Sequence, residues 1–155
     1  TDLFDLAIID VPDPLEGGPA YLLYTQEFYK LLRQHLNTDG VIVAQSGPTG
    51  PAFYKQCFSA VANTIKTAFP KVSTYEAFVP SFGSTWGFTW GSLRPDPEEL
   101  SIEEIDMRIA TRLINEPGFY DGLTHQGMFS VPKYLRKALS EETRVITKAE
   151  PLFVK

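Results

Sequence analysis

Leu3-Phe4-Asp5-Leu6-Ala7-Ile8-Ile9 runs directly into Asp10-Val11-Pro12-Asp13-Pro14-Leu15-Glu16-Gly17-Gly18-Pro19, and this junction decides the fold. The first run is nearly continuous in apolar side chains, which is typical of a strand buried within a parallel sheet. The second run holds three prolines and two glycines in ten positions, which excludes a helix or a central strand. We therefore expect a buried strand that ends at Asp10 and leads into a stiff loop at its carboxyl end.

Apolar periodicity continues this beginning as alternating helices and strands. Spacings of three and four residues predict an amphipathic helix over 25–36, and a turn at 37–40 then leads into a short apolar strand over 41–44. An apolar residue at every fourth position predicts a second helix over 52–69 and places Cys57 in the core. The predicted order is strand, helix, strand and helix.

The rest of the sequence predicts a hairpin followed by helices. Segments 72–79 and 86–93 are rich in β-branched and aromatic residues, which predicts two strands joined by a tight connection as an antiparallel edge of the sheet. Ser101 and Glu104 fit a capping box at the start of a third helix, and a short helix is predicted over 132–139. These elements extend the alternating pattern by one hairpin and two helices.

The alternation predicts an α/β fold, in which ligands gather at the carboxyl ends of the strands. A complete doubly wound domain normally begins with a strand, a glycine-rich turn and a later acidic residue for a ribose hydroxyl, and this set is absent here. The sequence therefore corresponds to the second half of a Rossmann-like domain. We expect residues 1–155 to form a single partial domain, in which 94–155 is a mostly helical C-terminal extension.

Composition restricts the partners and the compartment. The 155 residues are 43% hydrophobic and carry a net charge of −5, which supports a folded core and removes the attraction that nucleic acid or an anionic membrane requires. A cationic partner is favoured instead. No apolar run is long enough to span a membrane, and residues 1–5 show no targeting pattern, so we expect a cytoplasmic protein. Because Cys57 is the single cysteine and His35 and His125 are isolated, we expect no internal disulfide and no metal cluster.

Asp10 and Asp13 are the first candidates for chemistry. They stand three positions apart on the proline-stiffened loop, so two carboxylates can converge on one small volume. Such a pair suits a cationic amine, because a carboxylate can orient an ammonium group or accept a proton as an amine becomes a nucleophile. The local sequence also fits a structural role, in which Asp10 caps the strand end and Asp13 forms an Asx-turn before Pro14. Both interpretations stay open at this level.

Several segments form a longer pattern in a fixed order along the chain. They are 4–14, 18–20, 23–29, 40–45, 79–82 and 86–88. With these segments, residues 3–93 resemble the polyamine aminopropyltransferases, the spermidine synthase family. The Asp-x-x-Asp-Pro loop with its downstream Gly-Pro is the most specific part. Segments 100–108 and 142–145 resemble the tail of the branch that contains thermospermine synthase and the triamine or agmatine aminopropyltransferases.

The resemblance implies a class I methyltransferase-type sheet and an aminopropyl transfer reaction. The family moves the aminopropyl group of decarboxylated S-adenosylmethionine to an amine and releases methylthioadenosine, with no metal or prosthetic group. On this resemblance, Asp10 corresponds to the proton acceptor and Asp13 would hold the amine acceptor. Val11, Pro19 and Ala20 would line the methylthioadenosine side of the pocket.

Three further residues are candidates on the acceptor side. Gln45 would contact the reacting groups, although a glutamine at a strand end can equally bond to the backbone. Trp86 matches a family position near the acceptor, where its ring could face an ammonium group. Phe82 stands where many spermidine synthases carry a tyrosine, and this aromatic pair could instead serve hairpin packing. Without that hydroxyl, the sequence does not distinguish putrescine, spermidine and agmatine as the amine acceptor. The loop at 15–18 is longer than the usual form in the family, which favours the branch that uses longer acceptors.

The resemblance also defines what these 155 residues lack. The family's N-terminal β-domain and the glycine-rich first half of its sheet have no counterpart here, so we expect that half, or another chain of a homo-oligomer, to complete the site. Alone, the chain would be inactive and would expose an apolar strand edge that invites association. The alternatives are a noncatalytic assembly or binding module and a small-molecule methyltransferase, and the second carboxylate, Asp13, argues against the methyltransferase.

Overall fold

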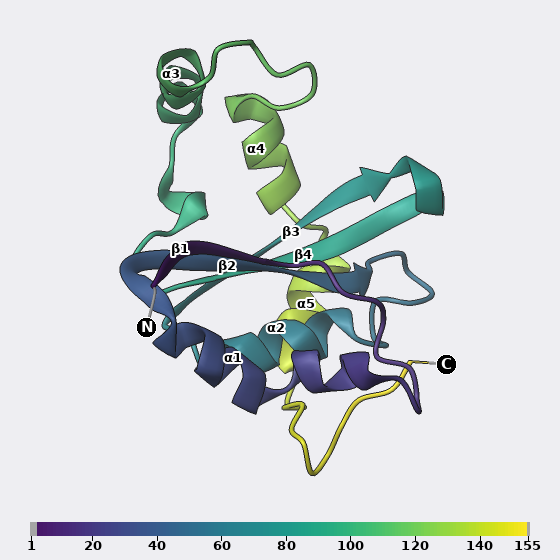
Figure 1. Ribbon diagram of the computed structural model, residues 1–155. Helices are drawn as coiled ribbons and strands as arrows, with labels where there is room; N and C mark the ends of the chain where they lie inside the picture. Colours follow the sequence, from purple (N-terminus) through teal and green to yellow (C-terminus); the bar gives the residue numbers. More distant parts are fainter. Residues whose placement is uncertain (1–2, 155) are drawn as a thin grey trace.

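The strands form one mixed sheet in the order β1-β2-β4-β3 (Figure 1). The computed structural model describes residues 3–154, so the first two residues of the N-terminal segment examined for a targeting pattern lie outside it. The strands are β1 (Phe4–Ile9), β2 (Leu36–Pro48), β3 (Lys71–Val79) and β4 (Ser84–Ser92). β1 and β2 are parallel, whereas β4 runs antiparallel to both β2 and β3. The predicted α/β fold with an antiparallel edge hairpin is therefore confirmed.

Helices cover the two faces of the sheet unequally. In Figure 1, one group of helices lies on one face of the sheet and a second group lies on the other. The first group is α1 (Gln26–Gln34), α2 (Phe58–Lys66) and α5 (Lys133–Glu141); the second is α3 (Ile102–Arg112) and α4 (Gly122–Phe129). Short 3-10 turns complete the set: η1 (Pro19–Tyr24), η2 (Pro80–Phe82) and η3 (Pro97–Glu99). No helix within residues 3–154 is long and apolar enough to cross a membrane.

The core lies between β2 and the helices α1 and α2. Ile42 of β2, Val61 and Ile65 of α2 and Tyr29 of α1 are fully buried there. A second cluster joins α2 to α5, and its buried members are Phe58, Val131 and Leu135. Helix α2 therefore packs against both clusters, and its apolar side chains are covered. On α1, Leu31 is the exposed large apolar residue.

Several predicted boundaries change because long-range pairing overrides local periodicity. The first helix ends at Gln34, and Leu36 already opens β2 as the pairing partner of Phe4. The predicted turn at 37–40 lies inside β2 as an irregular segment, since the register shifts before the next pair. The second helix begins at Phe58 rather than at 52, and residues 51–57 form turns.

The helices that follow the hairpin show what local signals can and cannot predict. The capping box is confirmed, because Glu104 N donates to Ser101 Oγ over 3.2 Å and Ser101 N donates to Glu104 Oε2 over 3.0 Å. The short helix near 132–139 is confirmed as α5. Helix α4 was not predicted, because its sequence contains two glycines, which disfavour a helix interior. Asp121 caps its N-terminus, because the Asp121 side chain accepts a hydrogen bond from Thr124 N.

β1 is less buried than its apolar sequence predicts. Phe4, Leu6 and Ile8 are 56%, 51% and 70% exposed, whereas Ala7 and Ile9 of the same strand pack against the core. Within the described residues, β1 pairs with β2 alone, and α4 contacts β3 at the far side of the sheet. An open strand edge and an uncovered apolar face therefore occur together at β1.

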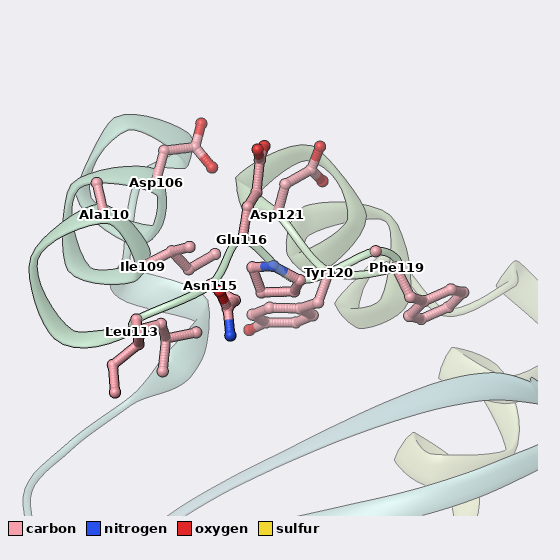
Figure 2. A pocket seen from close by; sticks show the side chains of 12 residues that line it. Asp106, Ile109, Ala110, Leu113, Asn115, Glu116, Phe119, Tyr120 and Asp121 are labelled. Carbon is pink, nitrogen blue, oxygen red and sulfur yellow. The ribbon is translucent and has the colours of Figure 1, made fainter.

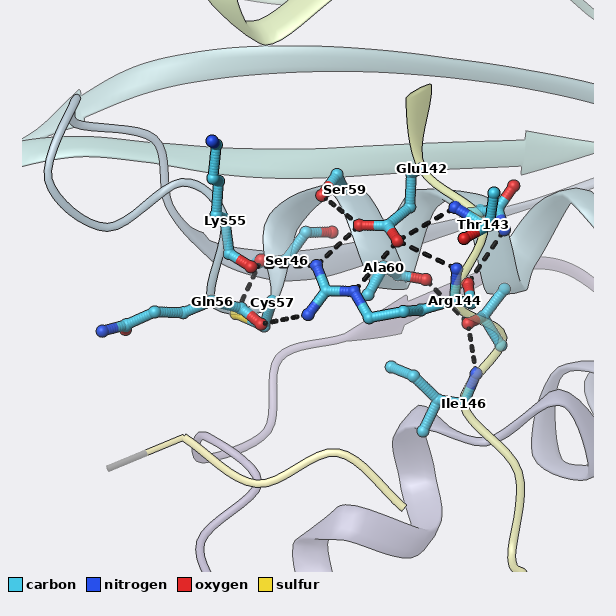
Figure 3. Close-up of polar contacts among 12 residues, drawn as sticks. Ser46, Lys55, Gln56, Cys57, Ser59, Ala60, Glu142, Thr143, Arg144 and Ile146 are labelled. Carbon is cyan, nitrogen blue, oxygen red and sulfur yellow. Dashed lines mark hydrogen bonds and ion pairs between the residues drawn. The ribbon is translucent and has the colours of Figure 1, made fainter. Parts of the chain in front are cut away.

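A buried carboxylate fastens the C-terminal tail to helix α2 (Figure 3). The Glu142 side chain is 7% exposed and accepts hydrogen bonds from Ser59 Oγ over 2.6 Å and from Arg144 Nε and Nη2 over 2.9 and 2.6 Å. Arg144 also donates to the carbonyl oxygen of Lys55 over 2.9 Å. These hydrogen bonds, those from Arg144 above all, lower the pKa of Glu142 to about 2. The tail is thus tied to α2 and to the turn before it.

We expect Arg144→Met to lower the free energy of unfolding by about 2 kcal/mol near neutral pH, because it leaves a buried carboxylate with fewer donors. Since the pKa of Glu142 is about 2 in the folded state and 4.5 ordinarily, its stabilisation is present above about pH 4.5 and is lost as the pH falls toward 2. Urea denaturation of the parent and of Arg144→Met, measured at about pH 7 and about pH 3, should therefore show a smaller difference in unfolding free energy at the lower pH.

The matched control for this measurement is Lys137→Met. Lys137 and Glu141 form an ion pair whose side chains are 71% and 65% exposed, so its removal should change the unfolding free energy by less than about 0.5 kcal/mol. If Arg144→Met lowers the unfolding free energy equally at both pH values, the effect of the substitution does not depend on the charge of the Glu142 carboxylate, and the assignment is wrong.

The open edge of β1 predicts that the isolated 155-residue chain associates with itself. Unpaired edges with apolar faces template pairing between chains, and a lysine on such an edge opposes it. Ile8→Lys should therefore lower the apparent mass measured by sedimentation. Leu31→Lys is the control, since it places the same charge at another exposed apolar position, on α1. If the parent chain is monomeric, or if both variants lower the apparent mass equally, the edge of β1 has no role in association.

Candidate active site

A pocket of about 560 Å³ opens where β1, β2 and the hairpin end at the same edge of the sheet. Its lining residues are Asp10, Val11, Pro12, Asp13, Gln45, Val79, Phe82, Trp86 and Phe88. Parallel β1 and β2 bring their carboxyl ends together, and the register of β2 with β4 sets Trp86 opposite Pro48. Six of the eight residues predicted from the sequence therefore meet in one pocket, although they come from three separate segments.

The loop after β1 presents both carboxylates to this pocket. The Asp10 side chain is exposed to solvent, and Asp13 is half-buried with Oδ1 3.4 Å from Gln45 Nε2. Leu15 N donates to the backbone carbonyl of Asp13 over 2.9 Å, so the turn here is closed by backbone rather than by the Asp13 carboxylate. Val154 N donates to the carbonyl of Pro14 over 3.0 Å, which ties the loop to the C-terminal tail. The two carboxylates are available on a loop that is held by its backbone.

Gln45 joins the walls of the pocket and is 7% exposed. Its Nε2 donates to the carbonyl oxygen of Val11 over 2.9 Å and to the hydroxyl of Tyr24 over 2.5 Å. Its Oε1 accepts from Trp86 Nε1 over 2.7 Å and from Gly47 N over 2.9 Å. The amide is thus engaged by protein groups on both of its ends, which favours the backbone-bonding interpretation of this residue over a contact to substrate.

A bulge in β2 aims this glutamine at its partners. The register with β4 shifts between Gln45 and Gly47, and Gly47 has a φ of +91°. A β-carbon at Gly47 would collide with Cys57 Sγ, which donates a hydrogen bond to the carbonyl of Ser46 over 3.1 Å. Glycine is required here for both reasons. Cys57 is buried, as predicted from the sequence, and its pKa is raised to about 12 by that burial, so it packs as a thiol.

Two aromatic rings line the same pocket as the carboxylates. The rings of Phe82 and Trp86 lie with centroids 4.6 Å apart, and Phe82 is 59% exposed. Phe82 belongs to η2, which Gly83 ends with a φ of +62°. The two rings pack on each other and also line the pocket, so hairpin packing and a binding surface coexist here. A pocket lined by both aromatic rings and carboxylates suits a cationic group with an apolar chain.

Pro19 and Ala20 do not line this pocket. Both lie at the start of η1, where Pro19 is exposed and Ala20 is half-buried. Their assignment to a second side of the site stays a prediction.

Tyr24 is a residue of this region that the sequence analysis did not single out. It is 1% exposed, and its hydroxyl donates to the carbonyl oxygens of Val11 and Pro12 over 3.3 and 3.2 Å. Burial, aided by the nearby Asp13 charge, raises the pKa of this phenol above its ordinary value. A buried tyrosine normally needs a partner for its hydroxyl, but the sequence does not show which tyrosines are buried.

A second cavity, of about 440 Å³, lies between α3 and α4 and is also rich in carboxylates (Figure 2). Asp106 accepts a hydrogen bond from Gly122 N, and Asp121 accepts one from Thr124 N, both over 2.7 Å. These side chains therefore serve the start of α4, and the cavity is far from the strand ends where α/β folds bind ligands. Among residues 3–154, no group of three His, Cys, Asp or Glu side chains is placed to hold a metal ion.

Comparison with known proteins identifies relatives of the chain. The sequence model of the family described as spermine/spermidine synthase domain matches residues 1–99. A polyamine aminopropyltransferase of Sulfurisphaera tokodaii is 40% identical over 151 residues, which are 97% of this chain and 49% of that protein. One of Saccharolobus solfataricus is 38% identical over 151 residues, with the same two coverages. The chain spans about half the length of the curated relatives it matches.

Solved structures give the same fold. A spermidine synthase in complex with the transition-state analogue AdoDATO superposes with a TM-score of 0.74 and 25% identity, covering 91% of this chain and 46% of that one. Spermidine synthase from Thermotoga maritima superposes with a TM-score of 0.70 and 24% identity, again over 91% of this chain and 45% of the other. The second comparison supports the fold alone.

Proposed function

Because this chain belongs to the spermine/spermidine synthase family, we propose that it forms the amine-binding and proton-accepting half of a polyamine aminopropyltransferase. The reaction would transfer the aminopropyl group of decarboxylated S-adenosylmethionine to an amine and release methylthioadenosine. The observation that carries this proposal is the pocket that Asp10 and Asp13 line together with two aromatic rings, those of Phe82 and Trp86. A polyamine combines ammonium groups with methylene chains, and this lining offers a partner to each.

The two carboxylates would divide the chemistry between them. Asp13, half-buried beside Gln45, would anchor an ammonium group of the acceptor. Asp10, at the strand end, would take the proton from the attacking amine as its nitrogen bonds to the carbon beside the sulfonium. The carbon–sulfur bond breaks with its electron pair remaining on sulfur, so methylthioadenosine leaves uncharged. Because Asp10 is exposed, it can return the proton to solvent after each turnover.

The sulfonium already activates the donor carbon, so alignment is the main task of the protein. Phe82 and Trp86 would hold the methylene chain and one ammonium group of the acceptor. The Gln45 amide would act in this alignment by fixing Trp86 and the loop at Val11, since its own hydrogen bonds are taken up by protein groups. The choice among putrescine, spermidine and agmatine, and the branch within the family, stay predictions.

The donor side of the site would be completed by polypeptide that these residues do not include. We propose that Val11, Pro19 and Ala20 face methylthioadenosine once the other half of the sheet is present. That half would pair with the open edge of β1 and cover Phe4, Leu6 and Ile8, the apolar side chains that the described helices leave exposed. Whether it comes from the same chain or from a partner in a homo-oligomer, and the cytoplasmic location, stay predictions.

We further propose that residues 1–155 belong to one domain, with 94–155 as its C-terminal extension. Support comes from α5 and the tail, which return to α2: Asn63 Nδ2 donates to the carbonyl of Arg144 over 2.9 Å, and Ile146 N donates to Thr64 Oγ1 over 2.9 Å. The buried contacts of Leu135 with the α2 cluster add an apolar attachment. Separate folding of 94–155 would expose these surfaces.

In the full-length protein, Asp10→Asn should lower the turnover of decarboxylated S-adenosylmethionine by about 10²-fold or more, the usual scale for loss of acid–base catalysis. Binding of methylthioadenosine should change much less, which calorimetry can measure. The matched control is Glu16→Gln, which removes a carboxylate from the exposed part of the same loop, outside the pocket. Near-full turnover of Asp10→Asn would move the proton acceptor elsewhere, with Asp13 as the first alternative. A parent protein that transfers methyl groups instead would refute the proposed reaction.

Asp13→Ala should raise the Michaelis constant of the amine acceptor and leave that of the sulfonium donor nearly unchanged. The reason is that Asp13 lies three positions further along the loop, beside Gln45, and lines the same pocket as Phe82 and Trp86. Initial rates measured with each substrate varied in turn separate the two constants. If the donor constant rises and the acceptor constant does not, the two substrates occupy the reverse positions.

A further inference from the structure

Behind the pocket, one buried hydroxyl connects the carboxylate loop to the strand beside it. The Tyr24 hydroxyl lies between the backbone carbonyls of Val11 and Pro12 on one side and the amide of Gln45 on the other. Tyr24 does not line the pocket, although Val11, Pro12 and Gln45 all do. The two carbonyls belong to the segment that separates Asp10 from Asp13. The Tyr24 hydroxyl is therefore hydrogen-bonded to the part of the loop that lies between the two carboxylates.

The directions of these hydrogen bonds follow from the chemistry of the groups. Trp86 Nε1 and Gly47 N are donors only, so the side of the Gln45 amide that faces them must be its oxygen. The NH₂ group of Gln45 then faces Tyr24 and Val11, and the phenol accepts one of its protons. Because carbonyl oxygens only accept, the phenol must use its own proton toward the loop. One orientation satisfies the whole network.

Burial keeps this arrangement in its protonated form. Desolvation is the largest cause that raises the pKa of Tyr24, and the negative charge of Asp13 acts in the same direction. The phenol therefore keeps its donor proton across the physiological pH range. Its side chain is 1% exposed, so water does not compete for the two carbonyls from the solvent side.

We propose that Tyr24 is a positioning residue for aminopropyl transfer. Its hydroxyl would hold the peptide segment between Asp10 and Asp13 at a fixed distance from Gln45 and Trp86, so that the proton acceptor and the amine anchor keep their separation. The inference rests on the proposed function for its kinetic consequence. Misplacement of a catalytic group by a fraction of an ångström to one ångström is enough to lower turnover measurably.

The chain offers a matched pair of tyrosines for the test. Tyr29 is also buried, at 0% exposure, and its hydroxyl has no hydrogen-bond partner within the described part of the chain. In the full-length protein, Tyr24→Phe should lower kcat about tenfold and change the donor KM by less than about twofold. Tyr29→Phe removes the same atom from the neighbouring helix and should leave kcat unchanged.

A second readout does not depend on activity. Trp86 Nε1–H is bonded to the amide that Tyr24 orients, so its indole ¹H–¹⁵N signal, assigned with Trp86→Phe, should move in Tyr24→Phe and stay in place in Tyr29→Phe. Replacement of Tyr24 by 4-aminophenylalanine restores a donor toward the loop and should recover most of the lost kcat. This rescue separates a missing hydrogen bond from a general loss of folding.

The outcomes distinguish the inference from the proposed function. If the parent protein does not transfer an aminopropyl group, the proposed function fails. Independently of activity, an indole signal that does not move in Tyr24→Phe would overturn the positioning role. If the parent is active and Tyr24→Phe matches Tyr29→Phe in kcat, the positioning role is overturned while the function stands. A fall in kcat for Tyr24→Phe alone, with rescue by the amino analogue and a shifted indole signal, supports the inference.

Discussion

The candidate site depends on the hydrogen bonds of one buried amide, that of Gln45. Its two ends contact four different parts of the chain: the loop after β1, η1, the bulge in β2 and the first residues of β4. In a buried place each unmade hydrogen bond is costly, so the four partners cannot move independently. These hydrogen bonds hold the four segments in one arrangement and thereby fix the shape of the pocket. They also explain why the strand-end glutamine is held away from solvent at 7% exposure.

At the sheet that builds the pocket, β1 is an edge strand with exposed apolar side chains within the described residues. Parallel pairing of β1 with β2 sets the carboxylate loop beside Gln45, and parallel strands normally have both of their faces covered. Here Ile8 is 70% exposed on one face, and the chain spans about half the length of its relatives. The loop that carries Asp10 and Asp13 follows this exposed strand directly in sequence. The polypeptide that we propose to cover β1 would therefore also lie beside the candidate site.

The C-terminal segment belongs to the same construction, although the family model ends at residue 99. The Glu142–Arg144 pair binds the turn at Lys55, and that turn leads to Cys57, which bonds the carbonyl of Ser46 in the bulge beside Gln45 (Figure 3). On the other side, the backbone of Val154 holds the loop at Pro14. The tail thus supports the pocket from behind without lining it.

The sequence by itself determined the features that depend on neighbours along the chain. These include the strand and stiff loop around Asp10, the hairpin, the capping box at Ser101 and the pair of carboxylates. Tertiary structure decided the rest: the engagement of Gln45, the role of Tyr24, the late start of α2 and the exposure of one face of β1. Each of these depends on a partner far away in sequence, as in the contact of Ser59 with Glu142 across 83 positions. Local periodicity shows which side chains prefer burial, but only the packed fold determines which distant groups become partners in hydrogen bonds.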